Sequence, residues 1–354
     1  MKKLIASMLA AALLLPAVQG FAADYTLSLN LPIPPVHKRW TNALKPWVEE
    51  LERRSGGRIK VEPYFAEALS KQGEAYDSVK NGLADMTESS FTVAFGQFPY
   101  HERMADFTDV TRSQDHPTEI LLTIQEGLPV VMKELEDAKH LFTHCLPIGM
   151  LIGTIKPVTS IEDLRGMKIA CIGGAVAAAK VNALGASAVT MPAGEVYMAL
   201  QQGIVDGATC DFQLLVSRRF GDLIKHLLPL NLVGGPFYCA MSQEIYDDMP
   251  EDLQKIIDDM SGQYAVDLFE KFWNDDQYES ARIWRDDMKG EIHFLSEDEY
   301  RKAAELVEPV QQEWIDKLNE LGLPGDAIAA RTRELEAQYN AKWNESRLHQ
   351  MFAQ

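Results

Sequence analysis

The chain has 354 residues, of which 46% are apolar and 24% are charged, as in an ordinary globular protein. Its 34 Lys and Arg residues are outnumbered by 52 Asp and Glu residues, which gives a formal net charge of −18. Such an acidic chain repels phosphate backbones and anionic lipids, so nucleic acids and membrane surfaces are not expected as partners. The length suggests two domains.

The N-terminus has the pattern of a secretory signal peptide. Lys2 and Lys3 precede an apolar run over residues 4–18, which is short for a bilayer span. Small residues at Gly20 and Ala22 predict cleavage after Ala22. We therefore expect a soluble, monomeric protein that is exported to the periplasm without stable insertion in the membrane.

Strands and helices alternate along the first part of the chain, which predicts a mostly parallel sheet with helices on its faces. The expected strands are 25–31, 58–61, 83–86 and a long strand-like stretch over 141–155. The expected helices are 40–51, 74–82 and 117–138.

The middle of the chain repeats this alternation. Strands are expected over 167–172, 188–191, 208–212 and 237–241, and helices over 175–184 and 195–203. The strand over 237–241 is expected to return to the first sheet. From residue 250, apolar residues recur every three or four positions, which predicts one long helix over 250–288. A break near Asn274 and Asp275 is the alternative, and residues 296–346 are helical again.

The pattern therefore predicts an α/β fold with two lobes and a long helix that spans both lobes. Lobe I is expected to comprise residues 23–146 and about 236–265. Lobe II is expected to comprise 147–235 and about 266–350, with a ligand cleft between the lobes.

The sequence contains no motif of a catalytic, nucleotide-binding or metal-binding site. There is no GxGxxG after the first strand, no GxxxxGK, no GxSxG and no HExxH, so we expect no cofactor, no metal and no enzymatic activity. Four cysteines lie in apolar, strand-like segments: Cys145, Cys171, Cys210 and Cys239. They are expected to be buried thiols, and a bridge between Cys171 and Cys210 is the alternative.

Several segments resemble signature blocks of one transport family. The stretch SGGRIKV over 55–61, the YD-to-GLAD step over 76–85 and DLRGMKI over 163–169 are similar to conserved blocks of solute receptors of TRAP (tripartite ATP-independent periplasmic) transporters. The block GEVYMALQQGIVDG over 194–207 is the most specific. The resemblance runs from about residue 25 to 345.

The resemblance implies a two-lobed receptor with the fold of a periplasmic binding protein, type II-like, that closes over a small organic solute, usually a carboxylate. It also implies delivery of that solute to the membrane permease subunits of the transporter. Alternatives of other classes are a receptor for a sensor kinase or an ABC importer, and a periplasmic enzyme with Glu88 as a base.

The sequence departs from the family at the residue that usually holds the carboxylate. Most members carry an Arg after the KI of the strand, and its guanidinium matches a carboxylate with two parallel hydrogen bonds. This chain has Ala170 there. Possible substitutes are Arg218, Arg219 and Lys168, although a surface role is expected for each.

Acids and aromatic residues accumulate where the family has cleft-lining loops. The acids are Glu67, Glu88 and Asp211, and the aromatic residues are Tyr64, Phe65, Phe91, Phe212, Phe237 and Tyr238. Carboxylates and aromatic faces bind ammonium groups. This composition favours an amine or zwitterion as ligand, with a carboxylate held by other groups as the close alternative, followed by a neutral or aromatic solute.

Overall fold

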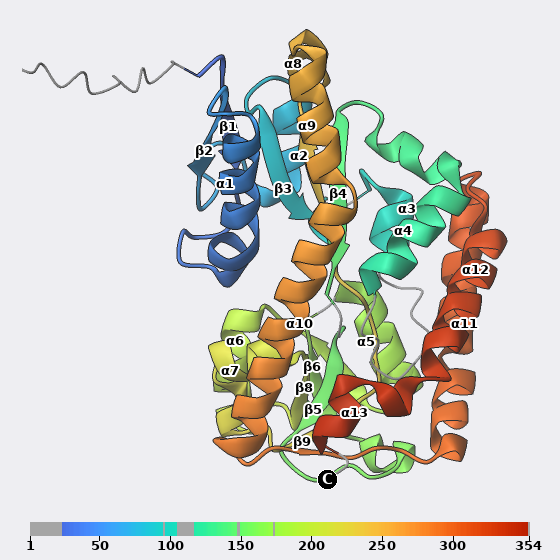
Figure 1. The fold of residues 1–354 in the computed structure, drawn as a ribbon. Helices are drawn as coiled ribbons and strands as arrows, with labels where there is room; N and C mark the ends of the chain where they lie inside the picture. The colour runs from blue at the N-terminus through green and yellow to red at the C-terminus, as the bar shows by residue number, and fades with distance from the viewer. Residues whose placement is uncertain (1–22, 95, 105–116, 147–148, 173, 353–354) are drawn as a thin grey trace, which may run out of the picture.

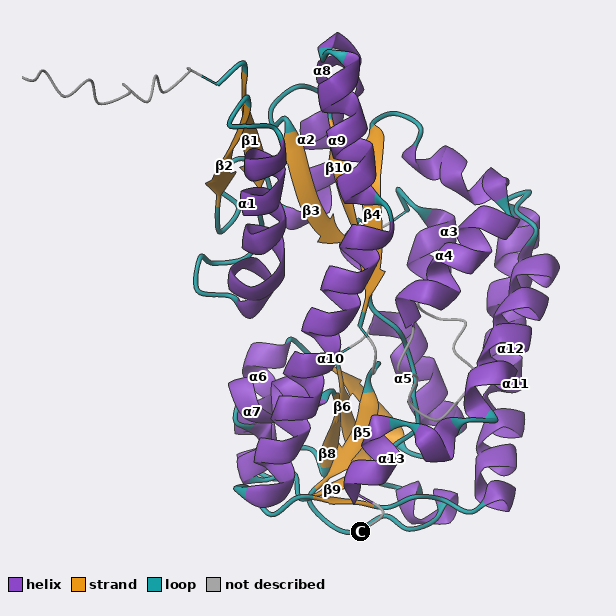
Figure 2. Ribbon diagram, viewed as in Figure 1, coloured by secondary structure: helices purple, strands orange, loops and turns teal. Residues whose placement is uncertain are grey.

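The computed structural model describes residues 23–94, 96–104, 117–146, 149–172 and 174–352. The predicted signal peptide lies outside these residues. Two β-sheets, each covered by helices, form two lobes that are stacked end to end (Figures 1 and 2). We call the first sheet with its helices lobe I and the second lobe II.

The sheet of lobe I has five strands in the order β2-β1-β3-β10-β4. These strands are β1 (Tyr25–Asn30), β2 (Ile59–Tyr64), β3 (Met86–Ser90), β4 (Lys139–Cys145) and β10 (Pro236–Met241). β1 is parallel to β2 and β3, whereas β10 is antiparallel to both β3 and β4. The strand expected over 237–241 therefore does return to the first sheet.

Helices cover both faces of this sheet and bury its apolar side chains. They are α1 (Lys45–Arg54), α2 (Ala75–Lys80), α3 (Pro99–Met104), α4 (Pro117–Gly127), α8 (Gln243–Asp248) and α9 (Glu251–Ser261). A π-helical turn, Trp40–Leu44, leads into α1. Trp47 on α1 is almost fully buried and donates its indole N–H to the carbonyl of Met260 on α9, so these two helices are locked together on one face.

The sheet of lobe II has six strands in the order β11-β9-β5-β8-β6-β7. They are β5 (Leu151–Thr154), β6 (Lys168–Cys171), β7 (Ser187–Thr190), β8 (Gly207–Cys210), β9 (His226–Leu228) and β11 (Glu291–Ile292). Its helices are α5 (Gly174–Ala183), α6 (Ala193–Gln201) and α7 (Phe212–Ser217).

The C-terminal part of the chain is helical and links the lobes. It comprises α10 (Gln263–Asp286), α11 (Glu297–Glu320), α12 (Gly325–Asn340) and α13 (Arg347–Phe352). Phe269 and Trp273 of α10 lie in the core of lobe I, whereas Tyr278 and Trp284 lie in a core of lobe II. α10 therefore spans both lobes, as the sequence predicts (Figure 1).

The long helix expected over 250–288 is interrupted, but not where the alternative placed the break. α9 ends at Ser261 and α10 begins at Gln263, because Gly262 has φ −86° and ψ −136°, which is far from helical values. Residues 274 and 275 lie inside α10 without interruption.

Three other boundaries differ from the prediction for local reasons. The helix expected over 117–138 ends at Gly127, and Pro129 opens a 3₁₀ segment. The stretch 141–155 is two strands in two different sheets, β4 and β5. The strand expected over 83–86 is shifted to β3, since the backbone N–H of Leu83 still bonds back to Ser78 in the turn after α2. Among the described residues, none of the helices has the length and apolar character that a membrane crossing requires.

Candidate functional site

The strand ends that face the opposite lobe show where a ligand would be held. β3 and β4 run in the same direction, because β10 is antiparallel to both, and their carboxyl ends point toward lobe II (Figure 2). In lobe II, β6 and β8 run antiparallel to β5, so their carboxyl ends point back toward lobe I. Ligands of such α/β folds bind outside the carboxyl ends of the strands.

A buried ion pair lies at this end of lobe I. Nε of Arg39, which follows β1, is 3.2 Å from Oε1 of Glu88 on β3, and the side chains are 6% and 0% exposed. The same Glu88 oxygen lies 3.1 Å from Nε2 of His144 on β4. Three segments that are distant in the sequence therefore meet at one carboxylate.

An indole from α10 fixes the tautomer of the histidine. Nε1 of Trp273 lies 3.0 Å from Nδ1 of His144. The indole N–H can only donate, so Nδ1 of a neutral His144 accepts and Nε2 carries the proton that it donates to Glu88. Arg39, Glu88, His144 and Trp273, which we call the hinge network, therefore connect lobe I to the helix that spans both lobes.

Aromatic rings enclose the hinge network. The His144 ring is stacked between Phe237 and Phe269, with centroid separations of 5.0 and 4.1 Å. The guanidinium carbon of Arg39 lies 4.5 Å from the centroid of the Phe237 ring, a cation–π contact. The network is thus built from charged groups packed against rings.

The charge states within the network follow from burial and from the partners. Burial alone raises the pKa of Glu88, but the Arg39 guanidinium and the His144 hydrogen bond outweigh it and bring the pKa below its usual value. Burial lowers the pKa of His144, against the opposing effect of Glu88. The network at neutral pH is therefore an Arg39–Glu88 ion pair with a neutral His144.

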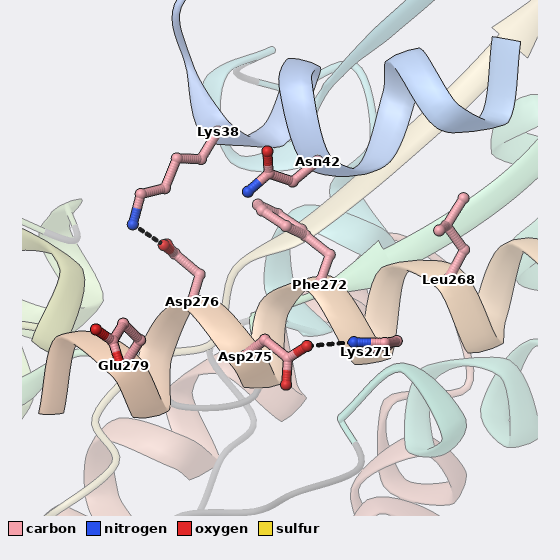
Figure 3. Close-up of a pocket in the computed structure, with 8 residues that line it drawn as sticks. All are labelled: Lys38, Asn42, Leu268, Lys271, Phe272, Asp275, Asp276 and Glu279. Carbon is pink, nitrogen blue, oxygen red and sulfur yellow. Dashed lines mark hydrogen bonds and ion pairs between the residues drawn. The ribbon is translucent and has the colours of Figure 1, made fainter. Parts of the chain in front are cut away.

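A second group of polar residues lies along α10, next to the network. Nζ of Lys38 is 2.5 Å from Oδ1 of Asp276, and Figure 3 shows this pair at the edge of a groove of about 470 Å³ between α10 and the segment before α1. The other oxygen of Asp276, Oδ2, is buried without a partner. Gln277, the next residue, donates to Oδ2 of Asp211 at 3.0 Å.

Asp211 is the N-cap of α7 and is almost completely buried. Its Oδ1 accepts a hydrogen bond from the backbone N–H of Leu214 at 2.7 Å, which satisfies one of the free N–H groups of the helix. Burial raises the pKa of Asp211 to about 6, even though the bonds from Leu214 and Gln277 oppose the shift.

The structure does not assemble the predicted acids into one cage. Glu88 lies in the hinge network and Asp211 at the start of α7, whereas Glu67 is exposed and accepts a hydrogen bond from the backbone N–H of Gln72. Glu67 has φ +63°, as its neighbour Ala66 has +53°, so the chain turns sharply there.

The predicted aromatic residues are likewise distributed over separate cores. Phe237 lies beside the hinge network, Phe212 is buried in lobe II beside Trp284, and Tyr238 lies in a third cluster with Phe91. Tyr64 is 37% exposed at the end of β2. Of this set, Phe237 contacts Arg39 of the hinge network.

The position that lacks the usual Arg is enclosed by protein. Ala170 is fully buried in β6 between Val189 of β7 and Ala208 of β8. None of the three possible substitutes lies at the carboxyl end of β6. Arg218 is exposed after α7, Arg219 is paired with Asp222, and Lys168 stands exposed at the amino end of the strand.

All four cysteines are buried and no disulfide bond joins them. Cys171 and Cys210 lie on neighbouring strands but in different hydrophobic clusters. The bridge considered as an alternative is therefore not formed.

Sequence reasoning missed Arg39, His144 and Trp273. The local signal was the basic run His37-Lys38-Arg39 after the proline-rich segment that follows the first strand. His144 and Trp273 are single residues in apolar segments, and they meet only because β4 packs beside α10.

The two lobes, the helix between them and the polar groups where the lobes meet define a two-lobed solute-binding protein. A sequence model of the bacterial extracellular solute-binding protein family 7, DctP, matches residues 33–317. The chain belongs to this family, whose members are periplasmic solute receptors of TRAP transporters and not enzymes.

Individual relatives agree with this assignment. The chain is 27% identical over 277 residues to a solute-binding protein of Verminephrobacter eiseniae, covering 76% of each chain. A TRAP periplasmic solute-binding protein from Desulfovibrio salexigens is similar in structure, with a TM-score of 0.82 at 23% identity, over 90% of this chain and 97% of that one. A TRAP solute-binding protein from a marine metagenome has a TM-score of 0.76 at 25% identity, and the match covers 89% of this chain and 99% of that one.

Proposed function

We propose that this receptor captures a small organic carboxylate and delivers it to the membrane subunits of a TRAP transporter. The observation that carries the proposal is the Arg39 guanidinium, which is held rigidly at the end of lobe I that faces lobe II. It would take over the role of the Arg that Ala170 replaces.

The guanidinium of Arg39 has N–H donors for which the described residues provide no acceptor. Its Nε faces Glu88, and among the described residues none accepts a hydrogen bond from its two terminal nitrogens. A planar guanidinium offers parallel N–H groups that match a carboxylate. Because Phe237 and Glu88 fix the orientation of the group, little side-chain entropy remains to be lost when a ligand binds.

The contacts of the acids favour a carboxylate over the amine that the composition suggested. Glu88 is neutralised by Arg39, and Asp276 by Lys38. Glu67 bonds to a backbone N–H, and Asp211 with its raised pKa carries a full negative charge only above pH 6. The charge near the hinge network is therefore close to balanced, which weakens the argument for an ammonium ligand.

The ligands named for similar proteins point the same way. The marine metagenome relative is described as specific for aromatic acid ligands, and structures from Rhodoferax ferrireducens and Bordetella bronchiseptica contain benzoate and mandelate. All these ligands are carboxylates. An ectoine-binding protein of Halomonas elongata is also a relative, and ectoine is a zwitterion that carries a carboxylate together with a cationic amidinium group.

The test is a thermal-shift screen of the purified chain, stripped of bound solute by unfolding in guanidinium and refolding. The ligands are benzoate, 3-hydroxybenzoate, mandelate, glucuronate, a C4-dicarboxylate, ectoine, and a series of primary and quaternary amines. We expect a rise in Tm with at least one carboxylate and none with the amines.

Variants then connect the binding to Arg39. Arg39→Lys keeps the charge but loses the planar fork, and we expect at least tenfold weaker binding by calorimetry. The double variant Arg39→Gln/Glu88→Gln retains an acceptor for His144 and should fold while binding no ligand. Arg218→Gln, an exposed arginine of lobe II, is the matched control and should bind as the parent does. Stabilisation by amines alone, or binding by the double variant at parental affinity, would overturn the proposal.

A further inference from the structure

The edge of the lobe II sheet carries a cluster of metal-binding side chains that lies apart from the hinge network. It consists of His226 on β9, Glu291 on β11 and His293 directly after β11. Their ligand atoms all lie within 4.8 Å of one another. Figure 1 shows β9 at the end of lobe II that is remote from lobe I.

Strand pairing places the three side chains on one face. In the parallel pair of β9 and β11, His226 is the direct partner of Glu291. His293 comes two residues after Glu291, so its side chain points to the same side of the extended chain. The backbone continues the pairing there, since the N–H of His293 bonds to the carbonyl of Leu227.

From this geometry we propose that His226, Glu291 and His293 bind one divalent first-row transition ion of the Zn²⁺ type. Two imidazoles and one carboxylate are a known zinc ligand set, with one position left for water. The separations are 2.9 Å between Nδ1 of His226 and Nε2 of His293, and 3.7 and 4.0 Å from these nitrogens to Oε2 of Glu291.

These separations are close to those of a loaded site. Two ligand atoms bonded to tetrahedral Zn²⁺ at about 2.1 Å lie roughly 3.4 Å apart. The two nitrogens would therefore move apart, and Glu291 would move inward, by about half an ångström. The side chain of Glu291 can move freely because it is 67% exposed. The side chains of His226 and His293 are only 16% and 20% exposed, so their surroundings hold them in place.

The surroundings leave space for an ion and its water. A groove of about 560 Å³ lies beside the cluster, lined by Arg285, Met351 and Phe352 in addition to the residues of β11. The charge of Arg285 is offset by Asp286, to which its Nε donates at 2.7 Å. A bound ion would join β11 to β9 and so hold the connection between α10 and α11 on the sheet.

No sequence motif indicates this site, because His226 and His293 are 67 residues apart in the chain. The sequence therefore predicted no metal. The proposal is independent of the solute that the receptor carries.

The experiment is calorimetric titration of the tag-free chain with Zn²⁺ after treatment with EDTA and dialysis. We expect one ion per chain, and at least tenfold weaker binding in His226→Gln and in His293→Gln. Glu291→Gln should weaken binding by a smaller factor. Its exposed side chain can be replaced without affecting folding, so this arm is informative even where a histidine variant is unstable.

A matched control is needed because an acidic surface binds zinc weakly at many places. Glu251→Gln removes an exposed acid on α9 in lobe I and should leave the tight site unchanged. X-ray absorption of the loaded chain should report two imidazole nitrogens and one carboxylate oxygen at about 2.0–2.2 Å. Equal zinc binding by the parent and the histidine variants, or no stoichiometric binding below 100-fold molar excess, would overturn the proposal.

Discussion

Nε of Arg39 lies 3.2 Å from Oε1 of Glu88, and the two side chains form an ion pair with almost no exposure to solvent. Buried charges are costly to desolvate, so each of these groups depends on the other. His144 adds a hydrogen bond to the same oxygen, and Trp273 of α10 fixes His144. Each charge of the pair is therefore compensated by the other, and the network connects them to the long helix.

Removing only the cation should be much more damaging than removing both charges. Arg39→Met leaves Glu88 buried without its counter-charge, and we expect a loss of about 3–5 kcal/mol in the free energy of unfolding. In Arg39→Met/Glu88→Gln the amide oxygen can still accept from His144, so most of that loss should be recovered. Urea unfolding of the two variants and the parent at pH 7.5 gives the comparison.

The same experiment can contradict this view of the network. If the single and the double variant are equally unstable, the loss comes from the missing Arg39 side chain and its contact with Phe237, and not from an uncompensated carboxylate. A Glu88→Gln single variant separates the two contributions further.

The fold could be predicted from the sequence where a pattern repeats over many residues. The alternation of strands and helices and the apolar periodicity of α10 are such patterns, and both were confirmed. The break at Gly262 was not predicted, because glycine inside a periodic helix is often tolerated. The division of 141–155 between two sheets was also missed, since an apolar run does not reveal where it changes partners.

The candidate site was harder to predict, because its residues meet only through the tertiary fold. Glu88 was identified by its place after a helix-to-strand step, but its partners Arg39 and His144 belong to segments that carry no motif. Phe212 was assigned to the cleft as an aromatic residue next to Asp211. A strand-to-helix junction turns neighbouring side chains in different directions, and Phe212 points into the core of lobe II.

Asp211 should make the stability of the protein depend on pH in an unusual direction. Burial raises its pKa from 3.8 to about 6 in the folded state. A carboxyl group with a raised pKa contributes fully below its unfolded pKa near 4, and this contribution is lost as the pH rises through about 6. The difference between a pKa of 3.8 and one of about 6 corresponds to about 3 kcal/mol in the free energy of unfolding.

Asp211→Asn should remove this dependence. The amide oxygen can still cap α7. When the amide group of Gln277 turns over, the new N–H₂ can donate to its Oε1, which is buried without a partner in the parent. We expect the variant to exceed the parent in unfolding free energy above pH 7 and to lose that advantage near pH 4. Urea titrations at five pH values measure the difference.

Asp163 is a control, because its pKa is shifted in the opposite direction to that of Asp211. It is an exposed capping carboxylate, and hydrogen bonds from the backbone N–H groups of Thr159 and Ser160 lower its pKa. Its contribution is present above the unfolded pKa and is lost as the pH falls, so Asp163→Asn should cost stability at neutral pH and little at pH 3. If the effects of Asp211→Asn and Asp163→Asn on stability change with pH in the same direction, the opposite pKa shifts of the two carboxyl groups are contradicted.

The cysteines should be inert in the folded protein. Burial raises the pKa of Cys145 to about 12 and that of Cys171 to about 11, so the thiolates that react with disulfide reagents are rare at neutral pH. We expect the native protein to react with fewer than one equivalent of dithionitrobenzoate in an hour, and the unfolded protein to react with four. A release of only two thiols on unfolding without reductant would reveal a bridge.

The residue that precedes β11, Gly290, should be sensitive to the addition of a single methyl group. A Cβ at Gly290 would lie 2.1 Å from Cε2 of Trp284, which is fully buried and donates its indole N–H to the carbonyl of Ile224 at 3.0 Å. The indole cannot yield without losing that bond, so Gly290→Ala should reduce the unfolding free energy by about 2–3 kcal/mol.

Gly194 on α6 is the matched control for this substitution. A Cβ there meets no atom within 4 Å, and its backbone is helical, so Gly194→Ala should stabilise the protein by about 0.5–1 kcal/mol. Thermal unfolding should therefore move in opposite directions for the two variants. If Gly290→Ala is as stable as the parent, Trp284 has room to shift, and the connection between α10 and β11 is looser than its contacts indicate. In that case zinc binding by Gly290→Ala should also match the parent, because the positions of Glu291 and His293 would not depend on this close packing.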